Sequence, residues 1–178
     1  NLPYGVTSIS HKIYDLHMAV FWISVAIAVM VFGVMIYSII RHRQSLGVTA
    51  SKFHGSTAVE IVWTLIPVLI LIVMAVPTTR VLLDMEDSSK PDLNIKVTGF
   101  QWYWRYDYLD DGFGFYSKMS TPQDQIHNKE AKGKWYLLEV DHPLVVPTDR
   151  KIRFLITSKD VNHSWWVREF GIKKDAIP

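Results

Sequence analysis

Two long apolar stretches dominate the first half of the chain. Residues 16–40 contain no Asp, Glu, Lys or Arg, and a helix of this length covers about 37 Å, more than the roughly 30 Å hydrocarbon core of a bilayer. A second apolar run, 61–77, continues through 81–83 after Arg80, whose long side chain can reach the interface. A soluble core helix is seldom apolar on all faces over such a length. The pattern predicts a transmembrane hairpin with spans at about 16–40 and 61–83.

The loop between the two runs indicates the orientation of the hairpin. Residues 41–59 carry Arg41, Arg43 and Lys52 and contain no Asp or Glu. The positive-inside rule places such a loop in the cytoplasm, or in the matrix of an organelle, with both termini on the other side of the membrane. Pro67 lies inside the second run and predicts a kink, which helix packing in a membrane tolerates.

After a polar linker the pattern changes to alternation with period two. Ile95 and Val97 alternate with Lys96 and Thr98, and aromatic residues dominate positions 100–108. Further strands are expected at 135–140, 144–146 and 151–157, and turns at 110–112 and 146–149. Short strands at this spacing predict an antiparallel all-β sandwich or barrel outside the membrane. The expected division is a hairpin of residues 1–89 and an external domain of residues 90–178.

Composition narrows the function classes. The 178 residues have a formal net charge of +2, with no run of like charge, which argues against a nucleic-acid partner. There is no cysteine, so these residues contain no disulfide, cysteine nucleophile or thiolate ligand. The first residue is Asn1 rather than Met. A removed signal peptide and a late start of the sequence both explain this.

His163 is the strongest candidate metal ligand among the seven histidines. It follows Val161 and Asn162, precedes Ser164 and Trp165, and is expected near the end of a strand. A rigid scaffold of this kind suits a ligand, although a lone histidine is more often a hydrogen-bonded structural residue.

Two further features could carry chemistry. The run Gln101, Trp102, Tyr103, Trp104 predicts Trp102 and Trp104 on one face of a strand and Tyr103 on the other. These rings serve either core packing or a partner-binding surface that shortens an electron path. Glu60 is the only acid between Asp15 and Asp84. It is either a charge at a helix N-terminus or part of a proton pathway.

Several motifs, in order along nearly the whole chain, resemble those of the cytochrome c oxidase subunit II family of bacterial type. The resemblance rests on Val-Glu-Ile-Val-Trp-Thr-Leu-Ile-Pro at 59–67, the aromatic run at 101–104, the segments 137–141 and 146–147, Ser-Lys-Asp-Val-Asn-His-Ser-Trp at 158–165, and 174–178. It implies a cupredoxin-like sandwich on the periplasmic side of a bacterial inner membrane. Such a domain carries dinuclear copper A, which passes electrons from cytochrome c to haem in subunit I. Oxygen is reduced to water there, coupled to proton pumping, and subunit III and the lipid membrane are further implied partners.

The resemblance also implies roles for individual residues. His163 matches a copper A ligand, and Glu60 matches the acid at the entrance of a proton channel. Trp102 matches the residue where electrons enter, next to Tyr103 and Trp104. Asp107, Asp141 and Asp160 match acids that attract the lysines of cytochrome c, and Asp110 and Asp111 are expected to add to that field.

One departure from the family pattern bears on the copper centre. The family supplies two bridging thiolates in a Cys-x-x-x-Cys segment, with a second histidine and a methionine, beyond the position of His163. None of these cysteines lies in residues 1–178, so copper A requires residues beyond 178. We therefore expect the sequence to be a C-terminally truncated part of a longer polypeptide, with an incomplete sandwich. The alternatives are subunit II of a quinol oxidase lacking copper A and a membrane-anchored β binding module without a redox role.

Overall fold

The computed structural model describes residues 2–47, 49, 52 and 54–178. The described chain forms two compact units. The helical unit extends to Glu86 and includes Glu169–Gly171, and the β unit consists of Asp87–Arg168 and Ile172–Pro178.

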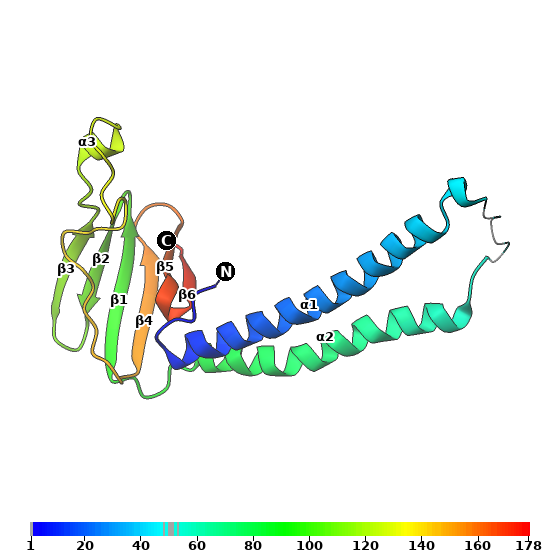
Figure 1. Cartoon of the computed structure of the whole chain (residues 1–178). Coiled ribbons are helices and arrows are strands. Elements are labelled where there is room, and N and C mark those ends of the chain that lie inside the picture. Colours follow the sequence, from blue (N-terminus) through cyan, green and yellow to red (C-terminus); the bar gives the residue numbers. More distant parts are fainter. Residues whose placement is uncertain (1, 48, 50–51, 53) are drawn as a thin grey trace. The chain divides into compact units, whose positions relative to one another are not determined.

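The helical unit is a hairpin of two long helices, α1 (Ser8–Arg41) and α2 (Thr57–Glu86) (Figure 1). Both are long and apolar enough to cross a membrane, and their apolar side chains lie largely exposed. Apolar side chains all round a helix need lipid or partner helices, not a single protein core, to cover them. The predicted transmembrane hairpin is confirmed.

Local hydrogen bonds and one ion pair define the ends of these helices. Thr7 caps α1, because its Oγ1 accepts from the Ser10 N–H at 3.0 Å while its own N–H donates to Ser10 Oγ at 2.9 Å. Lys12 near the start of α1 pairs with Asp84 near the end of α2, at 2.5 Å between Nζ and Oδ2. The one-turn helix η1 (Gln44–Leu46) follows α1.

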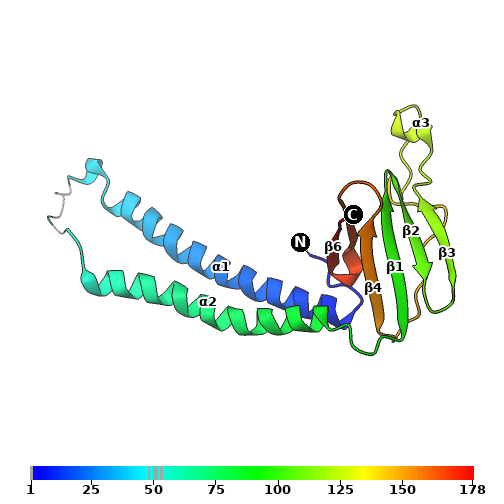
Figure 2. The same cartoon turned by 180° about the vertical axis from the view of Figure 1, so that it is seen from behind.

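The β unit contains a four-stranded sheet and a separate two-stranded hairpin. In Figure 1 and, from behind, Figure 2, the larger sheet has the order β3-β2-β1-β4. The strands β1 (Leu93–Phe100), β2 (Tyr103–Tyr108) and β3 (Phe113–Lys118) form an antiparallel meander. A long connection containing α3 (Gln123–Ile126) leads to β4 (Ile152–Ser158), which pairs with β1. The hairpin consists of β5 (His163–Val167) and β6 (Ile172–Ala176), joined through η2 (Arg168–Phe170).

The core lies between one face of the large sheet and the β5–β6 hairpin. Ile95 and Val97 are fully buried, and Tyr106, Tyr108 and Trp165 pack with them. The Trp165 Nε1–H donates to the Tyr106 hydroxyl at 3.3 Å, which satisfies the one polar atom that the indole brings into the core. The predicted alternation in β1 is confirmed for Ile95 and Val97, which are buried, and for Lys96, which is exposed, but Thr98 is buried as well.

The prediction of an antiparallel arrangement is wrong for one pair of strands. β1 and β4 are parallel, with Leu93 opposite Ile152 and Gly99 opposite Ser158. Parallel neighbours need a long crossover, and the connection after β3 supplies it.

The strands expected at 135–140 and 144–146 do not form. Residues 134–138 form turns, with Leu137 at φ 61°, and Val140 makes one isolated bridge to Met119. Local hydrogen bonds such as that from Leu138 N–H to the Trp135 carbonyl (2.8 Å) replace a ladder. The Val145 carbonyl accepts from the Tyr108 hydroxyl at 2.5 Å. The strand at 152–158 and the turns at 110–112 and 146–149 are confirmed, with Gly112 and Asp149 at positive φ.

Candidate functional site

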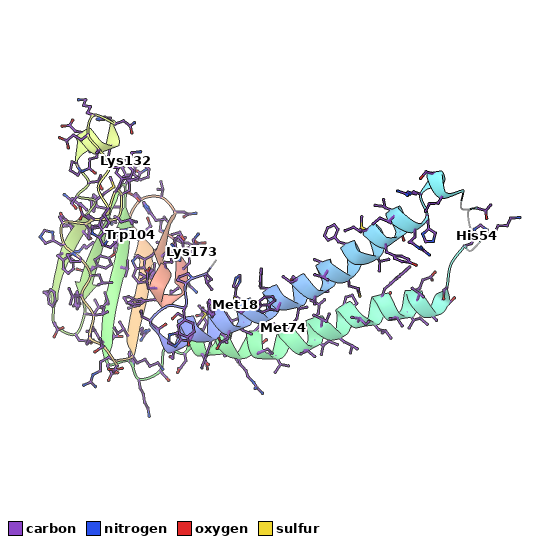
Figure 3. The ribbon with its side chains drawn as sticks, in the orientation of Figure 1. Met18, His54, Met74, Trp104, Lys132 and Lys173 are labelled. Atoms are coloured by element: carbon purple, nitrogen blue, oxygen red, sulfur yellow. The ribbon has the colours of Figure 1, made fainter. Side chains whose placement is uncertain are left out.

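His163, the predicted metal ligand, is the first residue of β5 and lies at one end of the large sheet. Its side chain is only 12% exposed. The ring lies against Gly99 of β1, where an ideal Cβ would come within 2.8 Å of its Cδ2. The edge of Trp104 contacts it from β2, with ring centroids 5.8 Å apart and an interplanar angle of 64°. Figure 3 labels Trp104 on the sheet. Two strands therefore hold the imidazole in a narrow slot.

Asp160 occupies the turn between β4 and β5 and accepts hydrogen bonds through both carboxylate oxygens. Oδ1 lies 2.6 Å from His163 Nε2 and 2.7 Å from Val161 N. Oδ2 accepts from the backbone N–H of Gln101 at 2.7 Å. The hydrogen bond with His163, followed by those from the Val161 and Gln101 amides, lowers the Asp160 pKa from 3.8 to about 2. Asp160 is therefore ionised at neutral pH.

Ser158, the last residue of β4, organises the same turn. Its Oγ donates to the carbonyl of Val161 and lies 3.3 Å from Asp160 Oδ1, while it accepts from the Asp160 N–H at 3.2 Å. The Lys159 N–H donates to the Gly99 carbonyl at 3.0 Å. These bonds fix the turn that precedes His163 against the end of β1.

Trp102 lies in the turn between β1 and β2 and is 79% exposed. The Gln101–Trp102 peptide bond is cis. The prediction that Trp102 and Trp104 share one face of a strand is wrong, because β2 begins at Tyr103 and strand alternation does not apply to Trp102. The Gln101 amide is hydrogen-bonded to Asp160, so the turn that carries the exposed indole lies beside the His163 slot.

Tyr103 lies on the opposite face of the sheet from His163, in an aromatic cluster. Its ring stacks on Phe100, with centroids 4.9 Å apart, and meets the edge of Tyr116 at 5.5 Å. Lys118 Nζ lies 5.4 Å from the Tyr103 ring centroid, within cation–π range. The expectation that Tyr103 faces away from Trp104 is confirmed.

The five acids predicted to attract a partner lie at different places in the β unit. Asp141 and Asp160 are near the Trp102 end, because Asp141 Oδ1 accepts from the N–H of Lys118, the residue opposite Tyr103. Asp110 and Asp111 lie in the turn at the other end of β2, roughly 20 Å away along the strand. Asp107 lies between them and pairs with Arg105 at 2.6 Å. Their shared role stays a prediction.

Glu60 lies in the first turn of α2 and is exposed in the chain. Its N–H donates to the Ser56 carbonyl at 3.0 Å, and the Thr64 hydroxyl donates to its carbonyl at 2.8 Å. A carboxylate in the first turn interacts favourably with the helix dipole. This placement suits both interpretations of Glu60, and the role at a proton channel stays a prediction.

The donor set around His163 fits one ligand of a dinuclear thiolate-bridged centre and does not fit the whole centre. A carboxylate on one ring nitrogen is the usual outer partner of a metal-bound imidazole. Within residues 2–47, 49, 52 and 54–178, no group of three or more His, Cys, Asp or Glu side chains could hold a metal ion. The sequence contains no cysteine to bridge two coppers.

An open cavity of about 630 Å³ lies at the other end of the sheet. Its lining includes Tyr108, Phe113, Asp110 and Arg150. None of the residues of the His163 slot lines it, so it is separate from the candidate site.

Residues that position the site could not be identified from residue type alone. Gly99 acts by leaving room for the His163 ring, and Ser158 acts through its hydroxyl in the turn. Gln101 acts through its backbone amide. The spacing of Ser158, Asp160 and His163 in one turn was the available signal, since serine and aspartate side chains bond to nearby backbone groups in turns.

Comparisons with known proteins identify relatives of the chain. Residues 1–81 match the sequence model "Cytochrome C oxidase subunit II, transmembrane domain", and residues 93–178 match "Cytochrome C oxidase subunit II, periplasmic domain". A protein of Rickettsia conorii named "Probable cytochrome c oxidase subunit 2" is 38% identical over 99% of this chain and 57% of its own length. Its counterpart in Rickettsia bellii is 35% identical over 96% of this chain and 62% of its own. The chain thus spans little more than half the length of these relatives.

The chain is also similar to a solved structure, the periplasmic domain of subunit II of cytochrome oxidase from Bradyrhizobium japonicum. That match has 44% identity and a TM-score of 0.42, and it covers 50% of this chain and 58% of the other.

Proposed function

Since the chain belongs to the cytochrome c oxidase subunit II family, we propose that it is the part of this subunit that receives electrons from cytochrome c. Residues 1–89 anchor it in a bacterial inner membrane, with both termini and the cupredoxin-like domain of residues 90–178 on the periplasmic side. Its partners are subunit I and subunit III, and the assembled oxidase reduces oxygen to water while it pumps protons.

Three residues of the β unit contribute directly to electron uptake. Trp102 offers an exposed indole that a donor protein can contact, and Trp104 brings a second ring to the edge of His163. His163 provides one nitrogen ligand for dinuclear copper A, which supplies a one-electron acceptor when bound. Its other ligands, including the sulfurs, come from outside residues 1–178. The observation that carries the proposal is the meeting of the exposed Trp102 turn and the His163 slot at Asp160.

Charge and proton roles complete the proposal. The five acids Asp107, Asp110, Asp111, Asp141 and Asp160 raise the local negative potential, and such charges mainly raise the encounter rate with a basic partner. Glu60 collects protons at the entrance of a channel that leads into subunit I. The haems and the oxygen-reducing copper belong to that subunit.

The test is Trp102→Phe in the assembled oxidase, with electron uptake from reduced cytochrome c followed by stopped flow. We expect the rate to fall about tenfold, equal to about 1.4 kcal/mol in the barrier, with assembly unchanged. Trp166→Phe is the matched control, because Trp166 is also exposed (58%) on β5. An unchanged rate in Trp102→Phe would contradict the role of Trp102. Oxidation of quinol without uptake from cytochrome c would favour a quinol oxidase subunit instead.

A further inference from the structure

We propose that the open face of the large sheet is the docking surface for a carboxylate-rich segment of another chain in the assembled oxidase. This outer face, turned away from the core, is defined by Lys96, Arg105, Tyr116, Lys118, Arg153 and Leu155. The inference goes beyond the proposed electron uptake and rests on it only in that the partner chain belongs to the oxidase.

Strand register places these side chains on one face of the sheet. Lys96 of β1 lies between Asp107 of β2 and Leu155 of β4. Its neighbours in the chain, Ile95 and Val97, are fully buried, and successive residues of a strand point to opposite faces. The outer face is therefore the reverse of the face that packs in the core.

The two faces of the sheet are covered differently. On the inner face, Trp165 of β5, Ile172 of β6 and Val146 of the long connection pack with the core residues. On the outer face, Tyr116 is 44% exposed and Leu155 is 37% exposed. These exposed side chains leave the outer face open to a partner, whereas the inner face is already filled.

The outer face has an excess of positive charge. The four strands of the sheet contain a single acid, Asp107, and four basic residues, Lys96, Arg105, Lys118 and Arg153. Arg105 donates to both oxygens of Asp107, from Nε at 2.9 and 3.0 Å and from Nη2 at 2.6 Å. Three of the four positive charges therefore have no acid in the sheet to match them.

Lys96 and Arg153 do not use their charges to stabilise the sheet. Lys96 lies opposite Asp107 in the register, yet that carboxylate lies over Gly114 and is bound by Arg105. Within the part of the chain that the structure describes, neither Lys96 nor Arg153 has an ion-pair partner. The two are diagonal neighbours across β1 and β4, where long side chains come within reach of each other and like charges repel. Both charges are thus available to the carboxylates of a partner.

Arg105 and Tyr116 give the outer face the composition of a protein interface. Arg105 Cζ lies 4.9 Å from the Tyr116 ring centroid, so the ring and Asp107 together hold the guanidinium in place. Arg and Tyr are enriched in the cores of interfaces and among the residues that dominate binding, and side chains that are already held lose little freedom on binding. A surface that binds anionic lipid instead gathers about 4–8 Lys or Arg. Carboxylates of a neighbouring protein chain match this face in charge.

The first experiment measures how fast Lys96 reacts with a water-soluble amine-specific ester in three samples. These are the chain alone in detergent, the chain alone in bilayers that contain anionic lipid, and the assembled oxidase. We expect the rate to fall about tenfold in the oxidase only, equal to about 1.4 kcal/mol of protection. Lys132, exposed on the long connection after β3, is the control and should react at the same rate in all three.

Two results of this experiment contradict the proposal. Equal rates for Lys96 in the oxidase and in the chain alone mean that no partner covers the face. Slow reaction already in the bilayer sample assigns the face to lipid headgroups instead of a protein. Both results come from the wild-type chain, so neither depends on whether a variant folds.

The second experiment tests whether the neighbour is acidic. A carbodiimide joins a lysine amine to a carboxylate in contact with it, with loss of water, and mass spectrometry locates the bond. We expect cross-links from Lys96 or Lys118 to Asp or Glu of another chain of the oxidase. Lys96→Glu should weaken retention of that chain during purification, while the unfolding midpoint of the variant chain alone stays as in the wild type. Lys96→Arg keeps the charge and should retain the chain normally.

Protection of Lys96 with neither a cross-link nor weaker retention in Lys96→Glu would overturn the assignment of an acidic partner. Failure of this inference is distinguishable from failure of the proposed function. A preparation from native membranes without haem-containing chains contradicts the proposed function, and the oxidase partner with it. Fast reaction of Lys96 in a preparation that contains those chains overturns the docking surface alone.

Discussion

Gly99→Ala tests whether the slot around His163 depends on the close approach of its ring to β1. An ideal Cβ at residue 99 would lie 2.8 Å from Cδ2 and 3.0 Å from Cγ of His163, and 3.1 Å from Cζ3 of Trp104. Ordinary contacts begin at 3.4 Å, so the imidazole must move by about 0.6 Å. A shift of that size along the bond lengthens the 2.6 Å contact between Nε2 and Asp160 to about 3.2 Å.

The expected change in unfolding free energy has two parts. Overpacking a filled site costs about 1–3 kcal/mol. Replacing glycine by alanine returns about 0.4–1 kcal/mol, because the unfolded chain loses conformational freedom. The net expectation is a loss of about 0–2.6 kcal/mol, with a weakened hydrogen bond between His163 Nε2 and Asp160. Guanidinium unfolding of the chain in detergent, followed by tryptophan fluorescence, measures the unfolding free energy. A ¹⁵N NMR spectrum of the labelled chain, read at the His163 ring nitrogens, measures the hydrogen bond.

Gly133→Ala is the matched control in the same unit. A Cβ there would meet only the Gln125 side chain, at 3.6 Å or more, so its stability should stay equal or rise slightly. If Gly99→Ala behaves like Gly133→Ala and leaves the His163 signal unchanged, the slot does not hold the ring.

Three further outcomes are expected. Ile95→Ala removes a fully buried side chain and should lower the unfolding free energy by about 2–5 kcal/mol; a loss below about 0.5 kcal/mol, as at surface sites, would show that the core lies elsewhere. Hydrogen bonds, first that from the Lys118 amide, lower the Asp141 pKa below its ordinary 3.8, so its stabilisation is present above that value and is lost as the pH falls through the folded pKa. Acid titration of unfolding should therefore be flatter in Asp141→Asn, and identical curves would argue against this contribution. Glu60→Ala should slow oxidase turnover through slower proton uptake, and unchanged turnover in the assembled enzyme would remove Glu60 from the channel.

Much of the fold could be predicted because its signals are local. An uncharged run of 25 residues can be satisfied only by a long helix in an apolar environment, and the alternation around Ile95 and Val97 requires a strand with one buried face. The parallel pairing of β1 with β4 leaves no such local trace, because it depends on residues far apart in the chain. The apolar residues at 135–140 fit a strand equally well by composition, yet local turns satisfy their backbone instead.

The candidate site could be predicted only in part, because some of its residues are recognisable locally and others act through contacts between distant parts of the chain. His163 and Trp102 are residues whose chemistry is visible in the sequence. Asp160 was predicted as a docking acid, and that role stays a prediction. Its hydrogen bond to the Gln101 amide, 59 residues away in the chain, could not be predicted from local sequence. Strand alternation also misplaced Trp102, because the chain leaves β1 at Phe100 and turns before β2 begins.

The long crossover between β3 and β4 has a consequence for how the protein folds. The meander of β1, β2 and β3 joins neighbours in the chain, so it can form early, whereas β4 must close a loop of dozens of residues before it pairs with β1. Asp160 follows β4, and His163 opens β5. The slot therefore comes into being only after this late, non-local step. A chain delayed at that step would expose the edge of β1 and leave His163 without its slot, so the candidate site is ordered only once the crossover has closed.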